Sequence, residues 1–255
     1  MPGKARHQLS RLWQHKARRA LYPTCLLLAA LGVSTVQAAD IVSAEYGSPT
    51  GRYPHGALGD TIEHASLIVT LKGGATLGIR LRDDLVFEDT APRLADVDGD
   101  GRSDVIAVES HTDKGARLVV WSLQGDALLR LAATPYIGRR FRWLAPVGAA
   151  DLDGDGQVEI AYIETPHLGK TLKIVRIVGK TLAPVAKLKG LTNHKIGDPL
   201  IQGRIATCKT GLTILTANAN WSRIIATTLH DGKLTSRDVA PYNGPKSFDH
   251  VTGCS

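Results

Sequence analysis

The sequence predicts an all-β fold, and within that class a small β-propeller. Short runs of β-branched and apolar residues recur between turns in four successive units, at a spacing of about 40 to 55 residues that is typical of propeller blades. An acidic loop occurs twice at the same place in this repeat, starting at Asp96 and, 55 residues later, at Asp151. No segment shows the apolar spacing of an amphipathic helix. The same strands could form a β-sandwich, which the regular repeat disfavours.

The first 38 residues are predicted to be a secretory signal peptide. Six basic residues and no acidic residue precede the apolar run 26–36, and Val36-Gln37-Ala38 has the small residues of a cleavage site. Eleven apolar residues are too few to cross a bilayer. We therefore expect export, to the periplasm or outside the cell, of a single domain formed by residues 39–255 with no membrane span. An uncleaved membrane anchor is the alternative.

Removal of this predicted signal peptide changes the net charge and the number of cysteines in the remaining domain. The formal net charge of the whole chain is +7, and the first 38 residues contribute six of these charges, which leaves +1 for residues 39–255. Such a domain has no strong field for nucleic acid, and it has few aromatic residues to stack on bases. Removal of Cys25 leaves Cys208 and Cys254, an even pair in an oxidising compartment, and predicts a disulfide between them.

Each unit is predicted to contain an inner strand and three further strands. The predicted inner strands are 57–59, 94–97, 146–150 and 196–201. The other predicted strands are 66–71, 76–81 and 85–88, then 104–110, 116–122 and 127–133, then 159–165, 171–178 and 182–188, then 212–217, 223–229 and 234–239. Residues 247–253 are expected to form a strand that completes the first blade and closes the ring. The count gives four blades, and five remain an alternative.

The two acidic loops predict bound cations. Asp96–Asp104 and Asp151–Glu159 each carry carboxylates at positions 1, 3, 5 and 9 and glycine at positions 4 and 6. Hard oxygen ligands at this density suit Ca²⁺, and the glycines permit the turn around the ion. An EF-hand is excluded because it needs a glutamate at position 12, where this chain has Ala107 and Tyr162.

The pattern Asp-x-Asp-Gly-Asp-Gly-x-x-Asp/Glu resembles FG-GAP/VCBS-type repeats, which occur in integrin α-subunit propellers and in many exported bacterial proteins. The Phe-Gly and Gly-Ala-Pro signatures of integrin repeats are missing, so the bacterial VCBS-type repeats are the closer comparison. The resemblance implies Ca²⁺ held in a hairpin loop on the rim of a propeller. The implied ligands are Asp96, Asp98, Asp100, the Arg102 carbonyl and Asp104, then Asp151, Asp153, Asp155, the Gln157 carbonyl and Glu159.

A second set of residues lies in the loops just ahead of the inner strands. In a propeller these positions converge on one face, so a polar site is expected around His55, Arg142, Trp143, His194 and His250. Imidazoles with an arginine suit an anionic or sugar-like ligand or a transition metal. The alternative is that these residues only cap loops and fill gaps. His167 is expected to be a solvated surface residue.

Two functions remain open from the sequence. The preferred hypothesis is a non-catalytic, monomeric, calcium-stabilised module that binds a protein or a glycan. The alternative is an enzyme, a hydrolase or lyase acting on an anionic substrate through the His/Arg/Trp cluster. The chain has no Gly-x-Ser-x-Gly or His-Glu-x-x-His motif.

Overall fold

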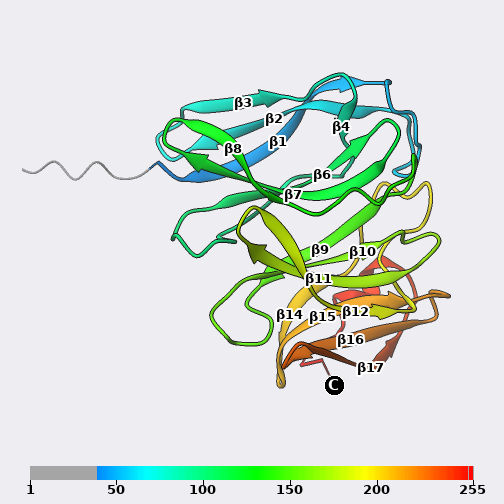
Figure 1. Ribbon diagram of the computed structural model, residues 1–255. Coiled ribbons are helices and arrows are strands. Elements are labelled where there is room, and N and C mark those ends of the chain that lie inside the picture. The colour runs from blue at the N-terminus through cyan, green and yellow to red at the C-terminus, as the bar shows by residue number, and fades with distance from the viewer. Residues whose placement is uncertain (1–38, 252, 255) are drawn as a thin grey trace, which may run out of the picture. The chain divides into compact units, whose positions relative to one another are not determined.

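The strands of the computed structural model form four antiparallel units that follow one another in chain order (Figure 1). The structure describes residues 39–251, 253 and 254, so the predicted signal peptide lies outside the described residues. In this part of the chain the only helical element is the 3₁₀ helix η1 (Pro245–Phe248). The described residues contain no helix long and apolar enough to span a bilayer. The predicted all-β class is confirmed.

Unit 1 consists of three strands, with β2 (Glu63–Leu71) paired on one side with β1 (Ile41–Thr50) and on the other with β3 (Thr76–Arg80). Strand β2 alternates between buried and half-buried residues, as expected when one face packs on a core. Strand β1 was not predicted, because most of its side chains are exposed or half-buried and it shows no regular apolar alternation.

Unit 2 is built around β6 (Asp104–His111), β7 (Gly115–Gln124) and β8 (Ala127–Ala133), which pair in that order. Two short strands, β4 (Leu85–Phe87) and β5 (Arg93–Ala95), pair with successive parts of the same edge of β6. The inner strand of this unit is therefore interrupted. The sequence had placed β4 in the first unit, and a single residue pair does connect it to β2.

Unit 3 has four consecutive strands, β9 (Leu144–Ala150), β10 (Glu159–Glu164), β11 (Thr171–Val178) and β12 (Thr181–Lys189). Its inner strand β9 is continuous and contains one register shift against β10. A single parallel pair joins β12 to β8 of unit 2.

Unit 4 repeats the interrupted inner strand of unit 2. Strands β13 (Leu191–Thr192) and β14 (Arg204–Cys208) both pair with β15 (Gly211–Asn218). Strands β16 (Arg223–His230) and β17 (Lys233–Pro241) complete this separate sheet.

Two predicted inner strands are wrong. Segments 57–59 and 196–201 lie in loops that contact each other, and the Gly197 N–H donates to the Ala57 carbonyl at 2.9 Å. Gly59 and Gly197 have φ angles of 100° and 79°, and this region of φ is incompatible with a regular β-strand.

The predicted closing strand at 247–253 is also wrong. In its place the tail forms η1, and Phe248 and Val251 are buried against Leu215 and Ile224 of unit 4. Apolar residues at these tail positions therefore serve the core of unit 4, and no strand of the tail completes unit 1 among the described residues.

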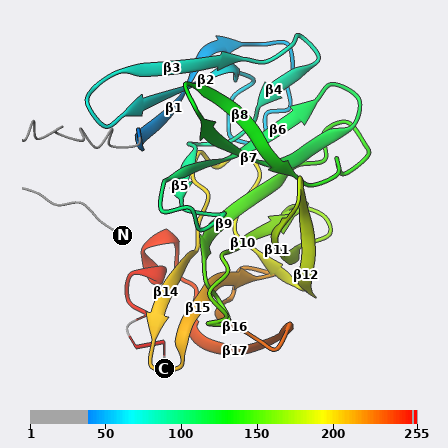
Figure 2. The same cartoon turned by 60° about the vertical axis from the view of Figure 1, so that its left-hand side comes forward.

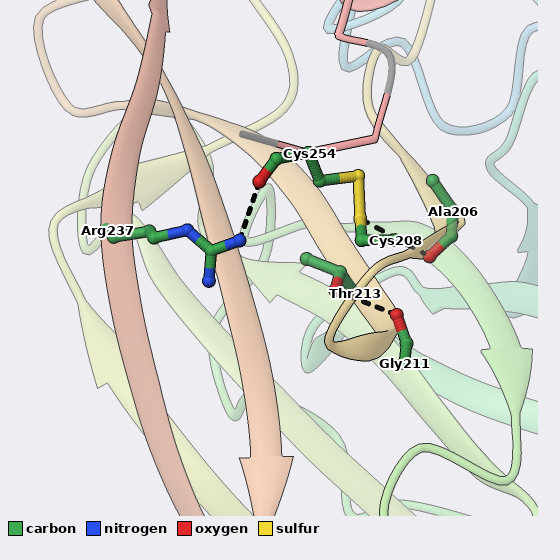
Figure 3. Close-up of a disulfide and its surroundings, with 6 residues drawn as sticks. All are labelled: Ala206, Cys208, Gly211, Thr213, Arg237 and Cys254. Atoms are coloured by element: carbon green, nitrogen blue, oxygen red, sulfur yellow. Dashed lines mark hydrogen bonds between the residues drawn. A yellow bond between two sulfur atoms is a disulfide. The ribbon is translucent and has the colours of Figure 1, made fainter.

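A disulfide joins this tail to unit 4, as the sequence predicted (Figure 3). Cys208 at the end of β14 is bonded to Cys254, with the two Cα atoms 5.1 Å apart. Arg237 of β17 donates from Nη2 to the Cys254 carbonyl at 2.6 Å. The disulfide is compatible with an oxidising compartment.

The cores lie between successive units. In β6, Val105 and Ala107 pack in the cluster shared with unit 1, whereas Ile106 and Val108 pack in the cluster shared with unit 3. Alternate residues point to opposite faces of a strand, so β6 is buried on both faces. β10 is sandwiched in the same way between units 2 and 4. Curled antiparallel units packed face to face in chain order (Figure 2) make this a β-propeller-like fold.

Candidate functional site

The two acidic loops occupy equivalent places in units 2 and 3. The first connects β5 to β6 and the second connects β9 to β10. They are neighbours in space, since a cavity of about 130 Å³ between them is lined by Asp98 and Gly99 of the first loop and by Gly156 and Gln157 of the second.

The carboxylate at position 1 organises the first loop. Asp96 accepts hydrogen bonds from the Gly99 N–H at 2.8 Å and from the Gly101 N–H at 2.9 Å. At position 9, Asp104 accepts from the Val97 N–H at 3.0 Å. Both glycines have positive φ angles, 77° and 83°, which explains why glycine occupies positions 4 and 6.

The second loop repeats this geometry. Asp151 accepts from Gly154 N at 2.8 Å and from Gly156 N at 3.0 Å. Glu159 reaches the Leu152 N–H at 2.9 Å, although it is one methylene longer than Asp104. The same nine-residue pattern therefore folds in the same way twice.

Each loop gathers three carboxylates that could hold one metal ion. The groups comprise positions 1, 3 and 9, and within each group the candidate ligand oxygens lie within 4.8 Å of one another. The members are Asp96, Asp98 and Asp104, and then Asp151, Asp153 and Glu159. The donors are all carboxylate oxygens, which is the chemistry of a hard cation.

Burial of these acids favours a bound cation. Asp104 and Glu159 are almost fully buried, and burial raises the pKa of Asp104 to about 6 and raises the pKa of Glu159. The Asp153 Oδ1 atom is buried and has no hydrogen-bond partner among the described residues. A cation would offset the cost of burying these oxygens, so the residues fit a metal ion.

The position 5 acids lie outside the two groups. Asp100 accepts from the side chain of Arg102 at 2.9 Å, and this bond lowers the Asp100 pKa. Asp155 accepts from the Gln157 N–H and from Arg176, and both bonds lower its pKa. In the structure both of these predicted ligands therefore accept hydrogen bonds from neighbouring protein groups.

Arg176 makes the two loops unequal. Its guanidinium lies 2.8 Å from Asp155 and 3.3 Å from Asp153, and it also contacts Glu159, its cross-strand neighbour on β10. In the first loop a serine interacts with the position 9 acid instead, since Ser122 hydrogen-bonds Asp104. In the second loop an arginine therefore contacts two of the three grouped carboxylates, whereas Arg102 of the first loop pairs with Asp100, outside its group.

Three of the five residues predicted for the polar face line one cavity of about 230 Å³, namely His55, Arg142 and Trp143. His194 lies directly behind this cavity and contacts it through His167. His250 does not line it, because the C-terminal tail folds onto unit 4. The remaining lining residues are Phe141, Thr165, Pro166, His167, Leu168 and Ile196.

A buried carboxylate orients His55. Glu88 is fully buried and accepts hydrogen bonds from His55 Nδ1 and Ser110 Oγ. Burial raises the Glu88 pKa, whereas the bond to His55 lowers it. Trp143 Nε1 donates to the Glu88 carbonyl at 2.8 Å. With Nδ1 committed to Glu88, a neutral His55 keeps an unprotonated Nε2.

A histidine pair forms the other side of the cavity. His194 Nε2 lies 2.7 Å from the Asp198 carbonyl, which can only accept, so this nitrogen carries the proton. His194 Nδ1 must then accept from His167 Nε2 at 2.8 Å. Burial, followed by neighbouring charge, lowers the His167 pKa to about 4, and burial also lowers the His194 pKa. Both rings are therefore neutral near pH 7.

The sequence analysis missed His167, Glu88 and Ser110. His167 was expected to be solvated, but it stacks on Trp143 with ring centroids 6.0 Å apart. Glu88 and Ser110 belong to the β4–β6 edge, and nothing in their local sequence distinguishes them from other strand residues. Only the pairing of β4 with β6 brings them to His55.

A comparison with known families supports the repeat assignment. Residues 96–162, which include both acidic loops, match the FG-GAP-like repeat family. No curated protein matches the chain significantly. The protein thus contains an FG-GAP-type repeat that spans the two candidate metal-binding loops.

Proposed function

We propose that this protein is an exported calcium-binding module that binds a protein or glycan ligand and has no catalytic activity. The observation that carries the proposal is the pair of acidic loops with the same internal hydrogen bonds, each gathering three carboxylates. The spacing is that of VCBS-type repeats, and the all-oxygen donor set favours Ca²⁺ over softer ions. The disulfide and the predicted signal peptide support export.

In this proposal the metal has a structural role. Each loop joins an inner strand to the next strand of its unit, so a bound ion would neutralise the acids and fix the start of β6 and of β10. Stabilisation by a ligand follows RT ln(1 + [L]/Kd), or about 2.7 kcal/mol at a hundredfold excess over Kd. We predict that chelation lowers the melting temperature by several degrees. An unchanged melting temperature would contradict this role.

The ligand face is proposed to surround the cavity at His55. Its edge carries the exposed apolar side chains of Leu168 and Ile196, which are 62% and 73% exposed, together with Arg142, which has no acidic partner among the described residues. This combination suits a ligand with apolar and anionic groups. A binding screen with immobilised glycans and proteins tests the proposal, with Arg142→Gln as the variant expected to lose the ligand and Arg204→Gln as the control.

Catalysis is the second candidate, because the Glu88–His55 pair is arranged as a general base would be. A buried carboxylate fixes Nδ1 and leaves Nε2 for proton transfer at the cavity. This candidate requires turnover of an anionic substrate that disappears in His55→Gln while calcium binding remains. The non-catalytic proposal predicts no turnover in either protein.

A further inference from the structure

A second cavity, of about 450 Å³, is lined mainly by cationic side chains. It lies between the outer parts of units 1 and 2, and its walls come from β3, β4, β6, β7 and β8 and from the segments that follow β3, β6 and β8. The cations that line it are Arg80, Arg82, Lys114, Arg117 and Arg130. These residues are spread over 51 positions of the sequence and form no basic run.

Two of the arginines are held in fixed positions. The fully buried Glu109 accepts from Arg117 Nε and Nη2 at 3.0 and 2.6 Å and from Arg130 Nη2 at 2.8 Å. The guanidinium of Arg117 also lies 4.4 Å from the ring centre of Tyr136, and that of Arg130 lies 4.9 Å from the ring centre of Trp121. Carboxylate bonds and cation–π contacts together restrict these side chains.

Hydrogen-bond donors remain free in this cavity. Arg117 Nη1 and Arg130 Nε and Nη1 have no partner among residues 39–251, 253 and 254, and neither Arg80 nor Lys114 forms an ion pair there. These free guanidinium N–H groups can donate to an acceptor bound in the cavity.

The charge at this cavity is strongly unbalanced. Five cations are matched by two carboxylates, Glu109 and Asp84, the latter paired with Arg82 at 2.8 Å. Three positive charges are left unmatched in a domain whose predicted net charge is +1. Planar guanidinium groups with free donors recognise oxyanions.

We propose that this cavity binds a small molecule through an oxyanion group, either a phosphate or a sulfate. The fixed guanidinium groups of Arg117 and Arg130 bind the oxyanion, and Arg80 and Lys114 add positive charge to the lining of the cavity. This site is separate from the acidic loops and from the cavity at His55.

Isothermal titration tests this site with inorganic phosphate and with inorganic sulfate, each at constant ionic strength against chloride. Calcium is left out, since phosphate would precipitate it. We expect saturable binding of at least one anion, weakened at least about tenfold in Arg80→Gln/Lys114→Gln through the loss of two charges. Neither residue forms an ion pair with the described residues, so the variant is expected to fold.

The matched control is Lys72→Gln/Lys233→Gln, which removes one charge from the β2–β3 hairpin and one from the β16–β17 hairpin and should leave binding unchanged. Methyl phosphate and methyl sulfate then distinguish the two sources of the oxyanion by their relative affinities. The proposal is overturned if neither inorganic anion binds beyond the chloride baseline, or if the control weakens binding as much as the cavity variant does.

Discussion

Glu63 provides a sensitive test of the buried electrostatics beside the cavity at His55. It is 2% exposed, and its pKa is raised to about 9, first by burial and then by the neighbouring acids Glu88, Asp60 and Asp89. The folded protein therefore keeps a proton on Glu63 at neutral pH, whereas the unfolded chain releases it above its ordinary value of 4.5.

The difference between the folded and unfolded pKa of Glu63 makes the stability of the protein depend on pH. Between pH 4.5 and about 9 the folded state binds more protons than the unfolded state, so this group makes stability fall as the pH rises. The loss is about 1.4 kcal/mol per pH unit, or about 4 kcal/mol between pH 5 and pH 8. Stability from this group is fully present only below its ordinary pKa.

The perturbation is Glu63→Gln, which cannot ionise. Urea unfolding at several pH values should show that the free energy of unfolding of the variant, relative to the unsubstituted protein, rises by about 4 kcal/mol from pH 5 to pH 8. Any loss of packing or hydrogen bonding in the variant adds a constant to this free-energy difference and leaves its change with pH unaltered. Glu45→Gln, on the exposed part of β1, is the control and should show no slope. Parallel curves for Glu63→Gln and the unsubstituted protein would refute the reasoning.

Three further predictions concern the loops and the tail. Replacing both Cys208 and Cys254 by serine should lower the free energy of unfolding by about 4 kcal/mol, the loop-closure entropy for a separation of 46 residues, and an unchanged urea midpoint would contradict this. Arg176→Ser should raise the calcium affinity of the second loop at least about tenfold, because it removes a competing charge; a calcium titration measures this, and equal affinity would show that Arg176 does not compete. Gly101→Ala should lower the free energy of unfolding by about 1–2 kcal/mol through its positive φ alone, since an added Cβ meets no atom within 4 Å. Thermal melting measures this, and Gly51→Ala, with equal space and no positive φ, is the control. Equal losses of stability in the two variants would refute the backbone argument.

Strands with a strong apolar pattern could be predicted from the sequence to within one or two residues. Strands β8 and β11 have the predicted bounds, and β6 and β10 differ by one residue. The apolar runs of β6, β10 and β11 arise because both faces of these strands are buried between units. Strand β1 could not be found, since its side chains are largely exposed. The wrong inner strands contain glycines whose positive φ depends on long-range contacts between loops.

The candidate sites could likewise be predicted where their geometry is local in sequence, and not where it depends on long-range contacts. The acidic loops are local, so nine residues suffice to predict their geometry. The cavity at His55 was predicted only in part, because its carboxylate, Glu88, reaches His55 through the pairing of β4 with β6. The prediction of His250 depended on a tail that would close the first unit, whereas the disulfide and the buried Phe248 keep the tail on unit 4.

Direct measurement of bound calcium tests the central claim. Isothermal titration of the purified protein with Ca²⁺ should detect two sites, the second weaker because Arg176 lies among its ligands. Asp98→Asn should remove the first site and Asp153→Asn the second, whereas Asp126→Asn, in the turn between β7 and β8, should leave both. Absence of binding at millimolar Ca²⁺, or binding that survives both loop substitutions together, would contradict the account.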